Sequence, residues 1–344
     1  MKITHIHIER FRGFQNEDFE VGSLLTAIAG QNGTQKSTLL GIITQTFTLK
    51  TEDSMRVEKP LCGGSYISAF KDKFRLSPTF DKPKGHEWTI SFDAGMDDFT
   101  VESIKRTGDP NVRFWKKGAR QEGDGYISFP TIFLSLKRLV PVAEEAKIIT
   151  DDTLLTQEEL NEFKQLHNKI LIAQTPISSA TTITSKNKQS IGVSTELYDW
   201  NQNSMGQDNL GKIILALFSF KRLHDKYPRQ YKGGILAIDE MDATMYPASQ
   251  VELLKVLRKY ASKLNLQILF TTHSMSLLKA MDDLVQEVTK KEETANQAKI
   301  LYLKKVDDKI AIKQGVNFKG IQLDLNVVAE GNNRKKNRIT AYTE

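Results

Sequence analysis

The sequence has almost no cysteine and no long apolar run, and both absences exclude classes of protein. Cys62 is the one cysteine among 344 residues, so no disulfide can form within the chain, and a reducing, cytoplasmic location is expected. No stretch approaches the roughly 18 consecutive apolar residues that a membrane-spanning helix requires. The start, MKITHIHIERF, alternates like a strand and lacks the apolar core of a signal peptide. We therefore expect neither a secreted disulfide scaffold nor a membrane protein.

The chain also has only a small excess of positive over negative charge. Lysine and arginine number 48 against 42 aspartates and glutamates, which gives a net charge of +6, and the two signs are interleaved through most of the chain. The one dense basic cluster is RKKNR at residues 334–338. This bias permits a nucleic-acid partner without requiring one, because solvated charge runs are common. The apolar content of 39% suffices for one large domain or two ordinary ones.

Strand-like and helix-like segments alternate along the chain. Patterns typical of strands occur at residues 3–8, 19–30, 87–93, 99–106, 130–136, 233–240 and 266–274, with shorter ones within 299–328. Helical periodicity occurs at residues 36–47, 152–174, 209–227 and 249–265. Thr156 and Glu159 are placed to form a capping box in the second of these helices. The alternation predicts an α/β fold with a mostly parallel sheet.

Changes in composition and sequence pattern divide the chain into four predicted parts. Residues 1–145 form an N-terminal lobe, and residues 146–200 form a helical and loop insertion whose Ser/Thr-rich stretch suits a short hairpin or a mobile loop. Residues 201–330 form a C-terminal lobe. Residues 331–344 end in RITAYTE, which is typical of the beginning of a strand. We therefore expect the natural protein to continue into a further domain.

A glycine-containing loop, AIAGQNGTQKSTLLG, follows an apolar run near residue 30. Its candidate nucleotide-binding residues are Gly30, Asn32, Gly33, Gln35, Lys36, Ser37 and Thr38. Glycines let backbone amides point at phosphate oxygens, while Lys36 would reach the β- and γ-phosphates and Ser37 would bind Mg²⁺. Gln35 stands where this motif asks for glycine. A strand–turn–helix with accidental spacing is the alternative for the loop taken alone.

Three further motifs place polar residues where strands end or a helix begins. Asp239 and Glu240 end GGILAIDE at the carboxyl edge of the sheet, where Asp239 would hold Mg²⁺ and Glu240 would act as general base. His273 ends the next strand and is a candidate γ-phosphate sensor. Ser204 and Gly206 precede a helix, whose N-terminus can bind anions. The structural alternatives are an exposed acidic turn, a structural histidine and a simple N-cap.

The order of these motifs is more specific than any one of them. It resembles the ABC class of AAA ATPases, in particular the branch of chromosome-maintenance and recombination-repair heads and OLD-type ATPases, as do FRGFQN and DEMDATMYP. The resemblance implies that Arg12 contacts the nucleotide, that NSMGQ with Gln207 is the signature, and that Asp242 is the D-loop aspartate. The implied catalytic residues are Lys36, Glu240 and His273, with ATP and Mg²⁺ as cofactors. The implied fold is an ABC-type ATPase head with a mostly parallel central sheet, an antiparallel β subdomain and a helical insertion.

A finer resemblance rests on three segments, AGQNGTQKSTLLG, PTIFLSLKRLVP and YDWNQNSMGQDNLGK. They are similar to the ATPase subunits of Septu and retron-associated anti-phage systems. This resemblance implies a homodimer or higher homo-oligomer with ATP between heads, an HNH-type nuclease partner and possible contact with DNA or retron RNA/DNA. It also implies a Toprim-like domain after Glu344. The expected function is an ATPase that senses invasion and controls the nuclease.

Other functions stay open at this point. Gln35, and Met205 in place of the usual signature glycine, suit a scaffold locked by ATP without hydrolysis. A DNA-repair head would bind duplex DNA through residues 334–338. A transporter's nucleotide-binding domain fits the motif order but not the FRGF start. Because Gln35 adds a side chain where the loop meets the phosphates, it can crowd the backbone or demand another φ/ψ, so we expect firm ATP binding with slow turnover.

Overall fold

The computed structural model describes most of the chain. The described residues are 1–67, 73–93, 95–105, 112–119, 124–139, 147–151, 154–173, 175–185 and 189–325. The basic cluster at 334–338 and the strand-like end RITAYTE lie outside them, so their expected roles stay predictions. No helix among the described residues combines the length and the apolar character needed to cross a bilayer.

A six-stranded sheet forms the centre of the fold, in the order β16-β15-β3-β14-β13-β9. In that order the strands are Lys309–Lys313, Ala298–Val306, Leu25–Gly30, Leu266–Thr272, Gly234–Ile238 and Thr131–Leu134. Every neighbouring pair is parallel except β15 with β16. The predicted α/β fold with a mostly parallel sheet is therefore confirmed.

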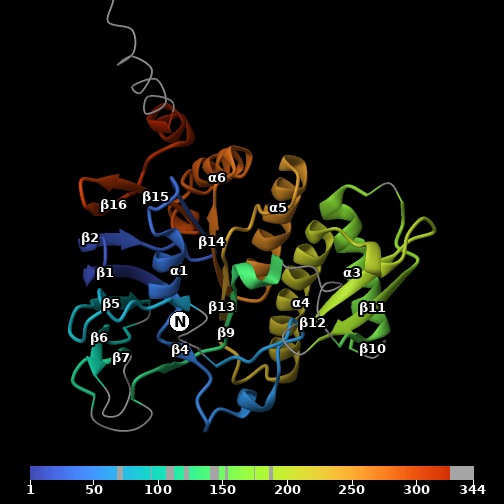
Figure 1. Ribbon diagram of the computed structural model, residues 1–344, viewed down its shortest axis with the longest axis horizontal. Coiled ribbons are helices and arrows are strands. Elements are labelled where there is room, and N and C mark those ends of the chain that lie inside the picture. The colour runs from blue at the N-terminus through green and yellow to red at the C-terminus, as the bar shows by residue number, and fades with distance from the viewer. Residues whose placement is uncertain are drawn as a thin grey trace, which may run out of the picture.

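Both faces of the central sheet are covered by apolar side chains. Along β14, Ile268 and Phe270 belong to the larger core, whereas Leu269 between them belongs to the smaller one. The larger core contains side chains of the helices α4, α5 and α6, and the smaller core contains those of α1 and a second sheet. Figure 1 shows these helices on one side and the second sheet on the other. Strands buried on both faces explain the continuous apolar runs of the sequence.

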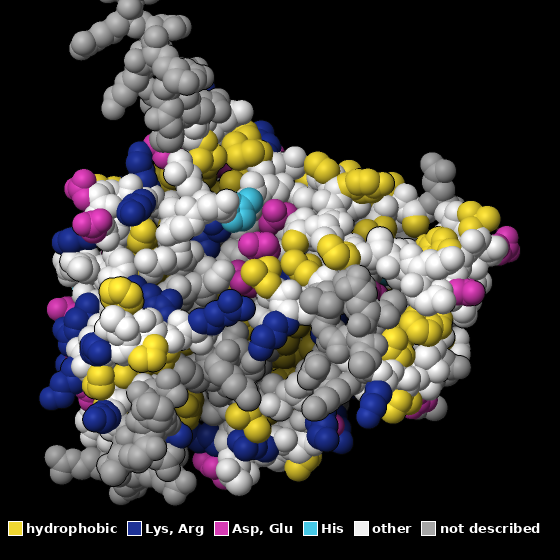
Figure 2. Space-filling view, viewed as in Figure 1, with side chains coloured by type: hydrophobic (Ala, Val, Ile, Leu, Met, Phe, Trp, Pro, Cys, Tyr) yellow, Lys and Arg dark blue, Asp and Glu magenta, His cyan; other side chains and the backbone are white. Residues whose placement is uncertain are grey.

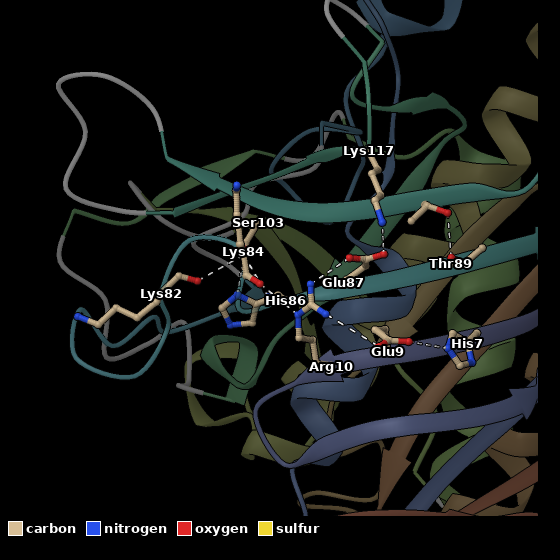
Figure 3. Close-up of polar contacts among 11 residues, drawn as sticks. His7, Glu9, Arg10, Lys82, Lys84, His86, Glu87, Thr89, Ser103 and Lys117 are labelled. Atoms are coloured by element: carbon tan, nitrogen blue, oxygen red, sulfur yellow. Dashed lines mark hydrogen bonds and ion pairs between the residues drawn. The ribbon is translucent and has the colours of Figure 1, made fainter.

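The second sheet is antiparallel, in the order β2-β1-β5-β6-β7. Its strands are Phe14–Glu20, Ile3–Phe11, Glu87–Phe92, Phe99–Lys105 and Val112–Lys116. On its polar face Glu87 lies between Arg10 and Lys117 and forms an ion pair with each (Figure 3). A separate two-stranded sheet pairs β4 (Phe47–Thr48) with β8 (Ile127–Ser128).

One predicted strand is divided in two. Residues 19–30 were expected to form one strand, but β2 ends at Glu20 and β3 begins at Leu25, and the two strands belong to different sheets. Between them the backbone amide of Ser23 donates to the carbonyl of Asn296, and that of Leu24 donates to the carbonyl of Gln297. The chain crosses between sheets here because these amides pair with the segment that precedes β15.

Helices complete the described layers. They are α1 (Lys36–Thr44), α3 (Gln157–Leu171), α4 (Met205–Lys226), α5 (Pro247–Lys263) and α6 (Met275–Val288), with short 3-10 turns η1 (Ser54–Val57), η2 (Leu136–Leu139), η4 (Trp200–Gln202) and η5 (Glu292–Thr294). The predicted capping box is confirmed, because Thr156 accepts from the amide of Glu159 and the Glu159 side chain accepts from the amide of Thr156. The shorter strands expected within 299–328 are β15 and β16, and residues 318–325 are helical. Asn317 caps that helix by accepting from the amide of Gly320.

Residues 146–200, the proposed insertion, contain more regular structure than a helix and a loop. Besides α3 they hold an antiparallel sheet of β10 (Ile149–Asp151), β11 (Ser179–Thr184) and β12 (Gln189–Ser194), so the Ser/Thr-rich stretch forms the hairpin. Arg222 of α4 donates to both carboxylate oxygens of Glu159 on α3. Lys221 of α4 forms an ion pair with one carboxylate oxygen of Glu162, also on α3. These contacts fasten α3 to α4.

Candidate nucleotide-binding site

Three neighbouring parallel strands end at one edge of the central sheet. The strand β3 leads into the glycine-containing loop, β14 leads into His273, and β13 leads into Asp239 and Glu240. The pairings of Ala29 with Thr272 and of Ile238 with Phe270 bring these ends into register. The fold therefore gathers the loop, the two acids and the histidine in the place where parallel sheets bind ligands.

The loop closes tightly around the end of β3. Gly30 has φ +151°, and a Cβ there would lie 2.4 Å from the carbonyl oxygen of Leu303. The Lys36 ammonium donates to the carbonyl oxygens of Gly30, at 2.9 Å, and Gln31, at 3.0 Å. Burial lowers the pKa of Lys36, and nearby carboxylates, Glu240 foremost, oppose that shift. The Lys36 side chain thus lies over its own loop and interacts electrostatically with nearby carboxylates.

The helix after the loop begins without a cap. Gln35 makes no side-chain cap bond, and the first turn of α1 carries no acidic residue. In contrast, α3 and α4 both begin with complete capping boxes. The first amides of a helix have no partner within the helix and carry partial positive charge. An uncapped start beside Lys36 is therefore suited to phosphate oxygens.

Hydroxyl and carboxylate oxygens meet beneath the loop. Ser37 Oγ donates to Asp239 Oδ1 at 2.8 Å, and Thr271 Oγ1 donates to the same oxygen at 2.7 Å. Oxygen ligands are those that Mg²⁺ prefers, usually one or two from the protein with the rest from water and phosphate. The described residues contain no group of three or more His, Cys, Asp or Glu that could hold a metal ion. Ser37 and Asp239 fit a magnesium site.

Glu240 has a constrained backbone and an uncommitted side chain. Its φ is 49°, in the left-handed region. Its amide donates to Thr271 Oγ1 at 2.6 Å, and its carbonyl accepts from Arg138 Nη2 at 2.8 Å. A left-handed conformation costs a non-glycine residue roughly 1–2 kcal/mol, so these two bonds hold Glu240 in place. Sequence reasoning missed both partners, although Arg138 lies within the quoted PTIFLSLKRLVP.

His273 and Asp242 lie next to each other at the same edge. The amide of His273 approaches both carboxylate oxygens of Asp242 at 3.4 Å. The His273 residue is exposed, and Asp242 is half-buried. Figure 2 shows a histidine and several acidic side chains gathered on one face of the molecule. The exposed His273 is therefore open to a ligand at this edge of the sheet.

Residues 204–207, the expected signature, form a capped helix start in close contact with Thr244. Ser204 and Gln207 complete a capping box, which is the structural role allowed for by the sequence. A Cβ on Gly206 would lie 2.5 Å from the carbonyl oxygen of Thr244, so only glycine allows this approach. Within the described chain, no hydrogen bond or ion pair joins residues 204–207 to the loop. The exposed Ser204 remains accessible from outside this chain.

Comparison with known proteins gives a family match over part of the chain and a likeness of fold. Residues 135–278 match the family described as AAA ATPase domain. No curated protein matches the chain. The solved SmcHead bound to the C-winged helix domain of ScpA has a TM-score of 0.50 at 14% identity, covering 91% of this chain and 97% of that one. The chain has the fold of an SMC ATPase head.

Two further SMC heads are similar in extent. One is the SMC head domain from Thermotoga maritima, with a TM-score of 0.49 and 14% identity, covering 91% of this chain and 99% of that one. The other is the Smc head domain with an extended coiled coil bound to the C-terminal domain of ScpA, derived from Pyrococcus furiosus. It has a TM-score of 0.49 and 12% identity, covering 95% of this chain and 99% of that one. Identity this low concerns the fold alone. With the family match over residues 135–278, the head fold supports an ATPase of the ABC and SMC-head type.

Arg12 of this SMC-type head is held beside the loop helix by a residue that the sequence did not indicate. Its guanidinium donates to both oxygens of Asp81 at 3.0 Å and to Thr38 Oγ1 at 3.3 Å. Burial acts to raise the pKa of Asp81, but hydrogen bonds, first from Arg12 and then from Ser77 and His86, lower it to about 2. Asp81 thus stays ionised and keeps Arg12 next to α1.

Gln35 keeps a glycine-like backbone in the head's loop. Its φ of 62° and ψ of 33° are left-handed. Its side-chain amide lies against Gly13, where a Cβ would come within 2.9 Å of Nε2. The Oε1 atom is buried without a hydrogen-bond partner among the described residues. The Gln35 side chain therefore packs beside Gly13 of the FRGF segment. The left-handed backbone of Gln35 is the strained part of the residue.

Replacing Gln35 by glycine should stabilise the protein by about 1 kcal/mol, because relief of the left-handed strain and of an unpaired buried oxygen exceeds the added entropy of the unfolded chain. Urea unfolding of the purified protein measures the change. The matched control is Gln35→Ala, which removes the amide but keeps the strained φ. Glycine should exceed alanine by about 1 kcal/mol. Equal stability of the two variants would show that the backbone at residue 35 is not strained.

Proposed function

We propose that the protein binds ATP with Mg²⁺ and hydrolyses it slowly. The observation that carries the proposal is the uncapped start of α1, with Lys36 over it and with Ser37 bonded to Asp239. A phosphate chain needs cationic and amide donors, and its metal needs oxygen ligands. Both kinds of group lie together at this edge.

Each residue has a distinct part in the proposed reaction. Lys36 and the first amides of α1 bind the phosphates, and Arg12 and Thr38 lie at the side of the same helix. Ser37 and Asp239 hold Mg²⁺, which when bound neutralises charge on the phosphate oxygens. Glu240 accepts a proton from the attacking water, and His273 orients the γ-phosphate. The strained loop at Gln35 motivates turnover below the rates of about 1–100 s⁻¹ typical of kinases.

We further propose that the site is completed by a second copy of the chain. Ser204, Gly206 and Gln207 would contact the γ-phosphate held by the partner, and Asp242 would lie between the two sites. The exposure of Ser204 and the absence of described hydrogen bonds or ion pairs from this turn to the chain's own loop support that arrangement. In the pair, two heads would associate head to tail with ATP between them.

A mixing experiment tests this proposal. Lys36→Ala removes the phosphate-binding lysine, and Ser204→Asp keeps the N-cap but sets a negative charge against the partner's phosphates. Each variant alone should be inactive. Mixed in equal amounts they should regain up to about a quarter of native turnover, since half of random pairs are mixed and each has one intact site. Ser204→Asn, which caps the helix without charge, is the matched control, and a mixture that neither regains turnover nor forms ATP-dependent dimers argues against shared sites.

The finer role rests on the resemblance of three segments to Septu and retron-associated ATPases. We propose that the ATP state of the heads controls an HNH-type nuclease in anti-phage defence, with DNA or retron RNA/DNA as a possible further partner. Genes for a reverse transcriptase or an HNH nuclease beside this one, and co-purification of the nuclease with the ATPase, would support the role. A neighbourhood without either gene would count against it.

A further inference from the structure

Arg138 is a buried cation that joins three elements around the catalytic edge. It follows β9 in η2 and is 3% exposed. Its Nε donates to Asn209 Oδ1 on α4 at 2.7 Å, and its Nη2 donates to the carbonyl of Glu240 at 2.8 Å. Its Nη1 donates to the carbonyls of Leu134 and Ser135, both at 3.1 Å. One side chain therefore contacts the end of β9, the signature helix and the catalytic turn.

Asn209 extends this connection to the D-loop. It is fully buried, and its Nδ2 donates to the carbonyl of Ala243 at 3.0 Å. One turn earlier on α4, Gly206 packs directly against the carbonyl of Thr244. Three contacts thus fix the start of α4 to the segment 240–244. The hydrogen bonds that join Arg138, Asn209, Glu240 and Ala243 are buried or partly buried, where loss of either partner is costly.

Burying the charge of Arg138 costs free energy, and packing alone would not require a charged side chain here. In these hydrogen bonds its acceptors are carbonyl and amide oxygens rather than a carboxylate. Burial lowers its pKa to about 10, and the nearby acids, Asp239 foremost, oppose that shift. An apolar side chain could fill the volume without desolvating a cation. The geometry that only a planar guanidinium provides is a better reason for its presence.

We propose that Arg138 and Asn209 are positioning residues that couple the two ATP sites of a pair of heads, an inference that rests on the proposed function. In such a pair, the start of α4 serves the partner's nucleotide, whereas Glu240 serves the chain's own. When Ser204 engages the partner's γ-phosphate, the rigid connection moves the carbonyl of Glu240 and so reorients the carboxylate of the other site. Closure at one site then sets the catalytic geometry at its neighbour.

The expected result is a loss of cooperativity without a loss of ATP binding. Native turnover plotted against ATP concentration should be sigmoidal, with a Hill coefficient above 1 and at most about 2 for two sites. Arg138→Lys keeps the charge but cannot reach Asn209, Glu240 and Leu134 together, and Asn209→Leu breaks the connection from its other end. Both variants should give a coefficient of about 1, with the Kd for ATP within about threefold of native. The number of nucleotides bound per chain gives the fraction of heads that are folded.

Arg222→Lys is the matched control, because Arg222 lies on the same helix and forms a comparable bidentate pair with Glu159 far from the signature turn. It should leave the Hill coefficient at the native value. The double variant Arg138→Lys/Asn209→Leu should be no less cooperative than either single variant, since both break one connection. A hyperbolic native curve, or cooperativity retained in either single variant, overturns the inference. Absence of an ATP-dependent dimer of Glu240→Gln in size-exclusion chromatography would instead refute the shared site itself.

Discussion

Replacing Glu240 by glutamine should lower the rate of ATP hydrolysis at least about 100-fold and leave ATP binding almost unchanged. Loss of a general base commonly costs this much or more. Glu240 is held in its left-handed conformation through its amide and carbonyl, which donate to Thr271 and accept from Arg138. Neither bond uses the carboxylate, so the substitution changes the chemistry of the side chain and not the shape of the turn.

Single-turnover hydrolysis and equilibrium binding of ATP separate the two effects. If the heads associate around ATP, the Glu240→Gln variant should also accumulate as an ATP-dependent dimer in size-exclusion chromatography. Glu252→Gln is a suitable control, because Glu252 is an acid on α5 that pairs only with the exposed Lys255 among the described contacts. Hydrolysis by Glu240→Gln within threefold of native would exclude Glu240 as the base. Absence of measurable hydrolysis by both proteins would instead favour the ATP-locked scaffold.

The motifs of the site could be predicted from the sequence because each is local. The loop and the ends of β13 and β14 are short segments whose apolar runs stop at polar residues, and parallel strands bring such ends to one edge. The N-caps at Thr156 and Ser204 are equally local, since a capping box spans four residues. Features that depend on interactions among a few neighbouring residues can therefore be predicted from a single sequence.

The connections between motifs could not be predicted in this way. Arg138 finds Asn209 across 71 positions, and Arg12 finds Asp81 across 69. Nothing near either arginine in the sequence indicates its partner, because the partner is chosen by how layers pack. The break between β2 and β3 was missed for the same reason, since Ser23 and Leu24 leave their strand to pair with residues 296 and 297.

The second large effect concerns His167, a buried histidine on α3. The residue is 2% exposed, stacks on Phe163 with ring centroids 5.8 Å apart, and has no hydrogen-bond partner for either ring nitrogen among the described residues. Burial lowers its pKa from 6.5 to about 4. The unfolded chain therefore binds the proton at a higher pH than the folded chain does.

The sign of the effect follows from this difference. Above about pH 6.5 both states are neutral, and the full stability is present. As the pH falls from about 6.5 to about 4, protonation favours the unfolded chain, and the free energy of unfolding should fall by about 3 kcal/mol. Below that window the loss from His167 is complete. Glu159 and Glu162 on the same helix also have lowered pKa values, so their contribution is lost only at the acid end.

His167→Phe isolates the effect because it keeps an aromatic ring on Phe163 and removes the titrating group. Urea unfolding of both proteins should give a difference in the free energy of unfolding that grows by about 3 kcal/mol in favour of the variant between pH 7.5 and pH 4. Subtracting the two curves cancels the carboxylates that they share. A constant difference would mean that the ring is hydrated or hydrogen-bonded in solution. The predicted slope would place the acid sensitivity of the head in α3, the helix that Glu159 and Glu162 fasten to α4.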